Sequence, residues 1–250
     1  MLNDGAPGKP FEPRDLEWTA DHVRRFWGYL AQSAHAERAY FSSHSGDALI
    51  AFVKARVPLV PGQRLLDFGC GPGFLVQRLA AQGLTTEGLE FSADSCARAV
   101  ERCKQYETFR GATLAEALPS PLPDASFDCV FLIEVIEHLL PEHIDGTFHE
   151  IHRLLKPGGH VVVTTPHAED LEAARTMCPE CGLIFHPWQH VSAFTAPKLA
   201  AMLSGHGFTE RYCRATTIGA GRGAGVMRIA RRLLGRDAFQ PHLVYIGRKP

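Results

Sequence analysis

The chain lacks three features that would assign it to a special class of protein. It has no run of about eighteen apolar residues, and its first fifteen residues contain neither the apolar segment nor the small-residue cleavage site of a secretory signal. It has no excess of either charge, since 26 Lys and Arg face 27 Asp and Glu, which argues against coating nucleic acid through bulk electrostatics. Only Cys178 and Cys181 among seven cysteines form a recognisable pair, and this favours reduced thiols. We therefore expect a cytoplasmic protein without a membrane span.

The composition supplies enough apolar residues for a large core, because 45% of the 250 residues are hydrophobic and 21% are charged. Residues 1–14, with three prolines and two glycines, are expected to form a flexible tail. Apolar spacings of three and four predict a helical cap over residues 15–60. Residues 61–250 then form the main domain, which holds an insertion rich in Cys and His at about 167–194.

Short apolar runs alternate with helical patterns after residue 61. Strands are predicted at 64–69, 84–90, 127–133, 160–165, 208–217 and 242–248, and helices at 74–82, 93–106, 141–155 and 196–204. Strands that alternate with helices of this length are typical of parallel crossover units. The pattern predicts an α/β fold with an open, mostly parallel sheet and helices on both faces.

Three glycines, Gly69, Gly71 and Gly73, stand where the first strand turns into the first helix, and they let a ligand approach the backbone. The dinucleotide fingerprint would need glycine where Phe74 stands, and a carboxylate at the end of the strand would repel a pyrophosphate. Glu90 closes the second strand about twenty residues on, where it can accept hydrogen bonds from two ribose hydroxyls. The turn therefore predicts a site for a nucleoside that tolerates or carries positive charge. The alternative is a tight turn beside a solvated carboxylate.

Eight of the thirteen histidines lie between His138 and His190, which makes this stretch a candidate for chemistry. Glu134, Glu137 and His138 follow the strand at 127–133, at the edge where open sheets keep their active sites. In a helical turn the three side chains would share one face, and two carboxylates there favour a divalent cation or a shared proton. A helix start that carries acids and one exposed histidine explains the spacing equally well.

The segment Cys178-Pro179-Glu180-Cys181-Gly182 has the tight turn that points two thiolates at one zinc ion. His186 follows closely as a candidate ligand. His167 or His190 could supply another, although His190 cannot serve two separate ions. The alternative is two free thiols in a loop.

The end of the chain is basic, with nine Lys or Arg against two acids from Gly205 to Pro250. Residues 226–236 are amphipathic and rich in arginine, so they could contact RNA or anionic lipid, or form a solvated helix at the edge of the sheet. The glycine-rich residues 219–225 before them are compatible with a lid.

Four motifs, in this order, resemble those of the class I S-adenosylmethionine-dependent methyltransferases. They are LLDFGCGPG at 65–73, GLEFS at 88–92, AEALPSPLPDASFD at 115–128 and LLKPGGHVVVTTPH at 154–167. The resemblance runs from about Arg64 to Lys249. It implies a Rossmann-like, seven-stranded sheet that binds S-adenosylmethionine.

The resemblance also implies where the cofactor lies. Asp67 and the three glycines would surround its methionine part, Glu90 would hold the ribose, Ala115 and Glu116 would lie at the adenine, and Phe91 and Ile133 complete the set. Many relatives carry Asp just before the Ala-Glu pair, whereas this chain has Leu114. Backbone groups would have to replace that carboxylate at the adenine.

The segment EVIEHL, residues 134–139, resembles two branches of the family, the ubiquinone-biosynthesis O-methyltransferases and the small-RNA 3′-terminal 2′-O-methyltransferases. In the RNA branch the corresponding Glu, Glu and His bind a divalent ion together with a later His, which His190 matches. The resemblance thus implies Glu134, Glu137, His138 and His190 as ligands of Mg, Mn, Fe, Co or Zn.

Together these features predict an S-adenosylmethionine-dependent methyltransferase that acts on an oxygen of a small phenolic or diol acceptor. Glu134 and His138 are the predicted catalytic residues, a divalent metal would assist, and without it His138 would be the general base. Two alternatives are an RNA 2′-O-methyltransferase and a sensor that binds S-adenosylmethionine without catalysis. The sequence leaves the oligomeric state open.

Overall fold

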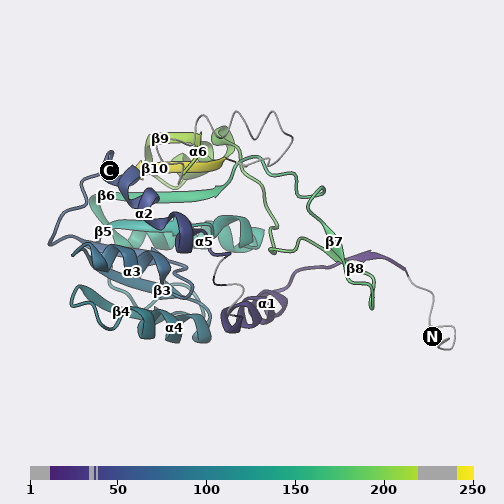
Figure 1. Ribbon diagram of the computed structural model, residues 1–250. Coiled ribbons are helices and arrows are strands. Elements are labelled where there is room, and N and C mark those ends of the chain that lie inside the picture. The colour runs from purple at the N-terminus through teal and green to yellow at the C-terminus, as the bar shows by residue number, and fades with distance from the viewer. Residues whose placement is uncertain (1–11, 34–36, 38, 219–240) are drawn as a thin grey trace, which may run out of the picture.

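The computed structural model describes residues 12–33, 37, 39–218 and 241–250, which are built around one seven-stranded sheet (Figure 1). The strand order is β4-β3-β2-β5-β6-β10-β9, and β10 runs antiparallel to both of its neighbours while the other pairs are parallel. The strands are β2 (Arg64–Phe68), β3 (Thr85–Glu90), β4 (Phe109–Leu114), β5 (Phe127–Ile133), β6 (Leu155–Pro166), β9 (Thr209–Thr216) and β10 (His242–Arg248). The predicted open, mostly parallel sheet is confirmed.

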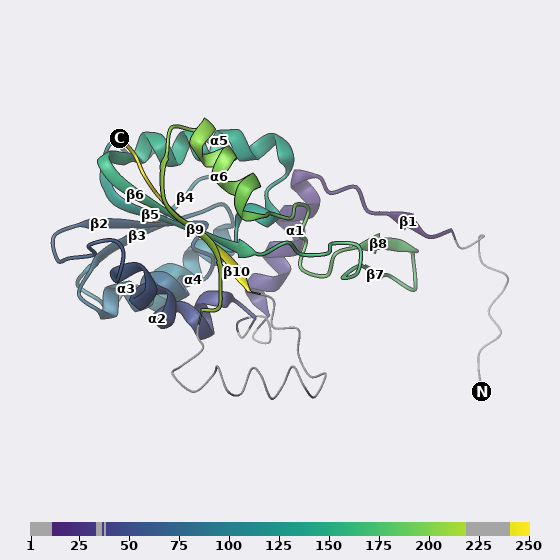
Figure 2. The same ribbon diagram turned by 90° about the horizontal axis from the view of Figure 1, so that it is seen from above.

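Helices cover both faces of the sheet, with α2, α3 and α4 on one side and α5 and α6 on the other (Figure 2). Their bounds are α2 (Phe41–Lys54), α3 (Phe74–Ala81), α4 (Ala93–Cys103), α5 (Pro141–Leu154) and α6 (Ala196–Gly205). Leu49 of α2 shares a buried cluster with Phe131 of β5, whereas Phe148 of α5 shares another cluster with Leu132. Because adjacent residues of a strand face opposite sides, both faces of β5 are buried.

Two strands differ from the prediction. β4 was not predicted, because its sequence FRGATL is only partly buried and lies at the edge of the sheet, where pairing with β3 defines it. β6 begins at Leu155 and not at His160. The glycine-rich residues 157–159 shift the register between β5 and β6 without ending the strand.

The helix α1 (Ala20–Gln32) lies at one end of the sheet, and part of the insertion extends away from the body (Figures 1 and 2). In this extension β1 (Arg14–Asp15) pairs with β8 (Leu183–Phe185), and β8 pairs with β7 (Thr176–Met177). The segment that precedes α1 is therefore held by the insertion. Arg14, which was expected to end a flexible tail, lies in a strand.

Some predicted segments lie outside the described residues. They are residues 1–11 of the expected tail, the glycine-rich stretch 219–225 and the basic stretch 226–236. In the part of the chain that the structure describes, no helix is long and apolar enough to cross a membrane.

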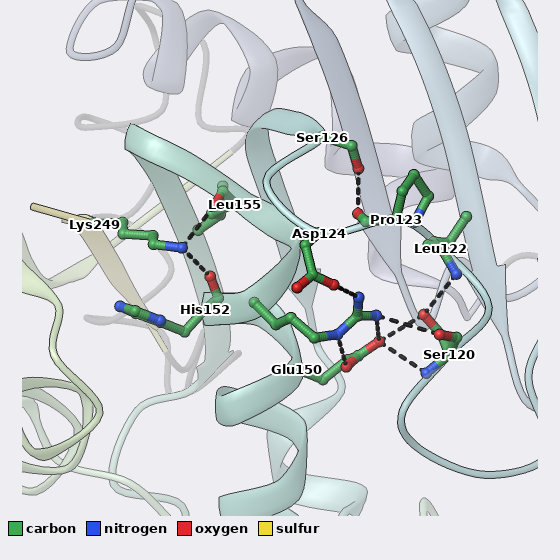
Figure 3. Close-up of polar contacts among 10 residues, drawn as sticks. Ser120, Leu122, Pro123, Asp124, Ser126, Glu150, His152, Leu155 and Lys249 are labelled. Atoms are coloured by element: carbon green, nitrogen blue, oxygen red, sulfur yellow. Dashed lines mark hydrogen bonds and ion pairs between the residues drawn. The ribbon is translucent and has the colours of Figure 1, made fainter.

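A polar network joins α5 to the loop that precedes β5 (Figure 3). Glu150 is 3% exposed and accepts hydrogen bonds from the backbone N and the Oγ of Ser120 at 2.9 and 2.6 Å. Arg153 donates to both carboxylate oxygens of Glu150 and pairs with Asp124. Burial alone would raise the pKa of Glu150, but the hydrogen bonds from Arg153 and Ser120 lower it overall. The network therefore keeps a buried carboxylate ionised.

Replacing Arg153 by Met should lower the free energy of unfolding by about 3 kcal/mol, because Glu150 would stay buried without its cation. Urea denaturation at pH 7 measures this loss. The matched control is Arg25→Met, whose pair with Asp21 is exposed and should contribute less than about 1 kcal/mol. Equal losses in the two variants would contradict the role assigned to Arg153.

Candidate active site

The loop between β2 and α3 is a tight glycine turn at the carboxyl end of a central strand. Gly69 and Gly73 have φ values of +77° and +82°. A Cβ on Gly73 would lie 2.9 Å from the Cα of Ala99 in α4, and a Cβ on Gly69 would lie 2.8 Å from a methyl of Val135. Both positions therefore require glycine. β2 pairs with β3 on one side and β5 on the other, so the turn lies where crossover connections diverge and ligands bind in open sheets.

Two carboxylates lie beside this turn. Glu90 accepts hydrogen bonds from the backbone N–H groups of Gly71, Phe91 and Ser92 at 2.7, 2.8 and 2.9 Å. Burial raises the pKa of Glu90, although these three bonds act to lower it. Burial, and then the charge of Glu90, raises the pKa of Asp67 to about 8. A cationic ligand at the turn would relieve the cost of both charges.

The turn opens into a cleft with a volume of about 260 Å³. Of the predicted cofactor-binding set, Asp67, Gly69, Gly71 and Ile133 line this cleft. Its lining also includes aromatic side chains from the amino-terminal segment, α3 and the insertion, namely Trp27, Tyr40, Phe41, Phe74 and Trp188. The lining of the cleft therefore combines a few polar groups with large apolar side chains, as ligand sites usually do.

Other members of the predicted set gather at the ends of β3 and β4, outside the lining of the cleft. The backbone N–H of Ala115 donates to the carbonyl oxygen of Glu90 at 2.9 Å. The ring of Phe91 is 38% exposed and lies 5.9 Å from that of Phe68, and Glu116 is exposed. These residues border the glycine turn on the side where the adenine is expected.

The segment after β5 does not form the predicted helical turn with three side chains on one face. Glu134 has a left-handed φ of +52° and precedes the 3₁₀ turn η2 (Ile136–His138). Its Oε1 lies 3.2 Å from Nδ1 of His242. Glu134 therefore stands apart, while ligand atoms of Glu137, His138 and His190 lie within 4.8 Å of one another. All four predicted ligands line the cleft.

Glu137 is buried and His138 is partly buried, and the Nδ1 of His138 has no hydrogen-bond partner among the described residues, while its Nε2 lies 3.9 Å from Glu137 Oε1. Glu137 is 1% exposed, and neither of its oxygens has a hydrogen-bond partner among the described residues. Burial, and then the charge of Glu134, raises the pKa of Glu137. Burial, and then His190, lowers the pKa of His138 to about 3, so its imidazole is neutral at pH 7.

The insertion carries His190 to this position through two sets of contacts. The backbone N–H groups of Val191 and Ser192 donate to the carbonyl oxygen of Glu137 at 2.8 and 3.3 Å. Gln189, which is fully buried, accepts from Trp27 Nε1 and donates to the carbonyl oxygen of His138, each at 2.9 Å. Gln189 and Trp27 were not predicted, because one amide and one aromatic residue carry no recognisable spacing.

Glu169 is a further residue that the sequence did not single out. Its Oε2 lies 2.5 Å from Nδ1 of His190, and its Oε1 lies 3.4 Å from Nε2 of His186. Burial alone would raise the pKa of Glu169, but His190 and His186 lower it overall. The clustering of histidines between 138 and 190 was a sequence signal, whereas nothing in the sequence distinguishes the partly buried Glu169 from the exposed acids Asp170 and Glu172 beside it.

His186 does not join the cysteine pair, which corrects the predicted zinc site. It groups with Glu169 and His190, whereas Cys178 and Cys181 lie between β7 and β8. The Gly182 N–H donates to the carbonyl oxygen of Cys178 at 2.9 Å, and backbone N–H groups of residues 181 and 180 lower the pKa of the Cys178 thiol. The pair forms a knuckle with no third ligand among the described residues.

Comparison with known proteins matches the chain to a family described as a methyltransferase domain, over residues 17–211. The chain is 35% identical to a ubiquinone biosynthesis O-methyltransferase of Alkalilimnicola ehrlichii over 107 residues. These residues cover 42% of this chain and 42% of that protein. It is 30% identical over 171 residues to a probable S-adenosylmethionine-dependent methyltransferase of Mycolicibacterium smegmatis, covering 68% of this chain and 60% of that protein. The chain spans about half the length of the curated relatives it matches.

Two solved structures share the fold. One is phosphoethanolamine N-methyltransferase 2 of Haemonchus contortus with phosphomonomethylethanolamine and S-adenosylhomocysteine, at a TM-score of 0.64 and 20% identity over 91% of this chain and 60% of that one. The other is a chain from the complex between the Haloferax volcanii Trm112 methyltransferase activator and a methyltransferase. It has a TM-score of 0.63 and 19% identity, over 91% of this chain and 98% of that one.

The family match covers most of the chain and agrees with the strand order and the glycine turn. The protein belongs to the class I S-adenosylmethionine-dependent methyltransferases, a family of enzymes, as its four motifs predicted.

Affinity for S-adenosylmethionine should rise as the pH increases from 6 to 8. Asp67, whose pKa lies at about 8, must lose its proton before it can attract the positive sulfonium, so the gain is at most about tenfold per pH unit. The protonated form of Asp67 also favours the fold, so stability should fall over the same range. Titration calorimetry at several pH values tests the first effect.

The control is Asp67→Asn, which cannot ionise and should bind the cofactor more weakly, with a flatter pH profile. The comparison also removes the contribution from the amino group of the cofactor itself. An identical pH slope in the two proteins would contradict a role for Asp67.

Proposed function

We propose that this protein transfers a methyl group to an oxygen of a small aromatic acceptor with adjacent hydroxyl groups, assisted by a divalent cation at Glu137, His138 and His190. The observation that supports the proposal is the state of Glu137. Its carboxylate is buried, and among the described residues no hydrogen bond of normal geometry reaches either oxygen; it lies beside two imidazoles and in the same cleft as Asp67. Such a charge is costly unless a cation or a proton compensates it.

The donor set fits a first-row transition ion. One carboxylate oxygen and two imidazole nitrogens suit Mn, Fe, Co or Zn better than Mg, which prefers oxygen ligands throughout. Burial keeps the pKa of His138 at about 3, which makes this imidazole a weak proton acceptor but leaves its lone pair free at neutral pH. A ligand role for His138 therefore agrees with its burial better than the role of sole general base.

Different residues of the cleft would have different roles in the reaction. Methyl transfer is an in-line displacement, so the protein must mainly align the donor with the attacking oxygen. Bound at the three ligands, the cation would lower the pKa of an acceptor hydroxyl. Trp27, Tyr40 and Trp188 would hold a planar ring and exclude water. Glu134, which lies 3.2 Å from His242 and lines the cleft, is placed to receive the released proton.

The charge of the cleft supports an acceptor without phosphate. Asp67, Glu134 and Glu137 line it, and no Lys or Arg does so among the described residues. Recognition of RNA depends on basic side chains at the phosphates. The lining therefore favours a small phenol or diol over RNA.

Glu137→Ala and His190→Ala should each reduce turnover about 100-fold while affinity for S-adenosylmethionine stays within about threefold, because the cation acts on the acceptor and not on the sulfonium. Methylation of catechol and of phenol, both uncharged at pH 7, with labelled cofactor provides the measurement. We expect transfer to the first only, loss of activity with a chelator, and recovery with one of the four ions.

The control is Glu142→Ala, which removes an acid from the first turn of α5 without touching the cleft. Normal turnover in Glu137→Ala and His190→Ala, with no effect of chelation, would reject the metal. Transfer to RNA oligonucleotides but to neither catechol nor phenol would reject the acceptor class.

We also propose that Cys178 and Cys181 bind zinc. The backbone N–H groups that stabilise the Cys178 thiolate support this, because metal-binding cysteine knuckles use the same turn.

Cys178→Ser combined with Cys181→Ser should lower the melting temperature by about 4 °C or more and leave cofactor affinity unchanged, because the ion would stabilise the insertion and not the cofactor site. Elemental analysis after reducing purification should find zinc in the wild type and less in the variant. The control is Cys213→Ser, which alters a thiol of β9 far along the chain from the knuckle. Absence of zinc from the wild type would refute this site.

A further inference from the structure

We propose that Glu169 and His186 are positioning residues that hold the proton of His190 on Nδ1 and so leave its Nε2 lone pair free for the cleft. The positioning itself stands on the contacts of the insertion. Only its consequence for metal binding rests on the proposed function.

The contacts of His186 determine which of its two ring nitrogens carries the proton. The backbone N–H groups of Trp188 and His190 both point at Nδ1 of His186, each at 3.3 Å. A backbone N–H can only donate, so Nδ1 of His186 carries a lone pair. The ring proton is therefore on Nε2, which faces Glu169 Oε1 at 3.4 Å.

The carboxylate of Glu169 lies between His186 and His190. Glu169 has one oxygen 3.4 Å from Nε2 of His186, an electrostatic contact outside hydrogen-bond geometry. Its other oxygen lies 2.5 Å from Nδ1 of His190. An ionised carboxylate only accepts hydrogen bonds, so this contact requires a proton on Nδ1 of His190.

The remaining ring nitrogen of His190 is Nε2. An imidazole that carries its single proton on Nδ1 has its lone pair on Nε2, so this is the atom that His190 can offer to the cleft. The ring of His190 lies 4.8 Å from that of His138 and is stacked on His186 at 4.4 Å, with 16° between the planes. Stacking and the carboxylate together restrict how the ring can turn. A carboxylate behind a histidine is a common way of orienting a metal ligand.

The same contacts argue against a second ion at Glu169, His186 and His190, although their ligand atoms are close enough. An ion there would need the lone pair of His186 on Nε2, whereas the two backbone N–H groups hold it on Nδ1. Glu169 and His186 therefore support the ligand and do not themselves bind.

Long-range ¹H–¹⁵N correlation spectra of protein labelled with ¹⁵N-histidine report which ring nitrogen is protonated. In the metal-free wild type, His190 should carry its proton on Nδ1, with its signals assigned from their loss in His190→Asn. In Glu169→Ala the proton should move to Nε2 in a large fraction of molecules. Glu169→Gln keeps an acceptor oxygen and should restore the Nδ1 proton at least in part.

Co²⁺ alone then serves as the probe of binding, through its visible absorption. Glu169→Ala should weaken Co²⁺ binding about 10- to 100-fold, Glu169→Gln less, and His186→Phe, which preserves the stacked ring, less than Glu169→Ala. Glu172→Ala is the matched control. It removes an exposed acid of the same insertion that pairs only with Arg175, and both readouts should match the wild type.

The two proposals fail in different ways. A proton on Nε2 of His190 in the wild type, or an unchanged tautomer in Glu169→Ala, would overturn the positioning role whatever the metal does. The expected tautomers without Co²⁺ binding in the wild type would leave positioning intact and reject the metal of the proposed function. Equal Co²⁺ affinity in the wild type and in Glu169→Ala would show that the tautomer does not control the ligand.

Discussion

The organisation of the site depends on the cost of taking carboxylates out of water. Glu90 offsets this cost with three backbone N–H groups of the glycine turn and its neighbours. For Glu137, its own backbone N–H and the Thr165 hydroxyl act only weakly against burial, and burial raises the pKa of both Asp67 and Glu137. Each therefore favours a positive partner. For Asp67 we expect this partner to be the sulfonium cofactor of the family, and for Glu137 it is the cation that we propose.

Segments that lie far apart in the sequence surround these carboxylates and contact one another. Gln189 connects Trp27 of α1 to the carbonyl oxygen of His138, so the cap, the insertion and η2 share one buried amide. The main-chain bonds from residues 191 and 192 to Glu137 add to this link. A change in the insertion should therefore reach the acceptor side of the cleft more readily than the cofactor side, which consists mainly of the glycine turn and the ends of β2 and β3.

The cofactor side could be predicted because its determinants are local. A glycine is required where φ is positive or another backbone lies close, and both conditions at Gly73 follow from the turn of a strand into a helix. The acid that ends β3 follows from strand length and order. The alternation of apolar runs and helical patterns likewise predicted the sheet, apart from edge strand β4, whose half-exposed residues carry little apolar signal.

The sequence by itself therefore determined the class of fold, the glycine turn and the residue types near the cofactor. Tertiary structure alone decided the acceptor side. Glu134 leaves the group because its backbone is left-handed, His186 turns to Glu169 and not to the cysteines, and His190 reaches Glu137 from about fifty residues away. These outcomes depend on how a long insertion packs across the edge of the sheet. Spacing along the chain does not encode such contacts, because they bring together residues that no local period relates.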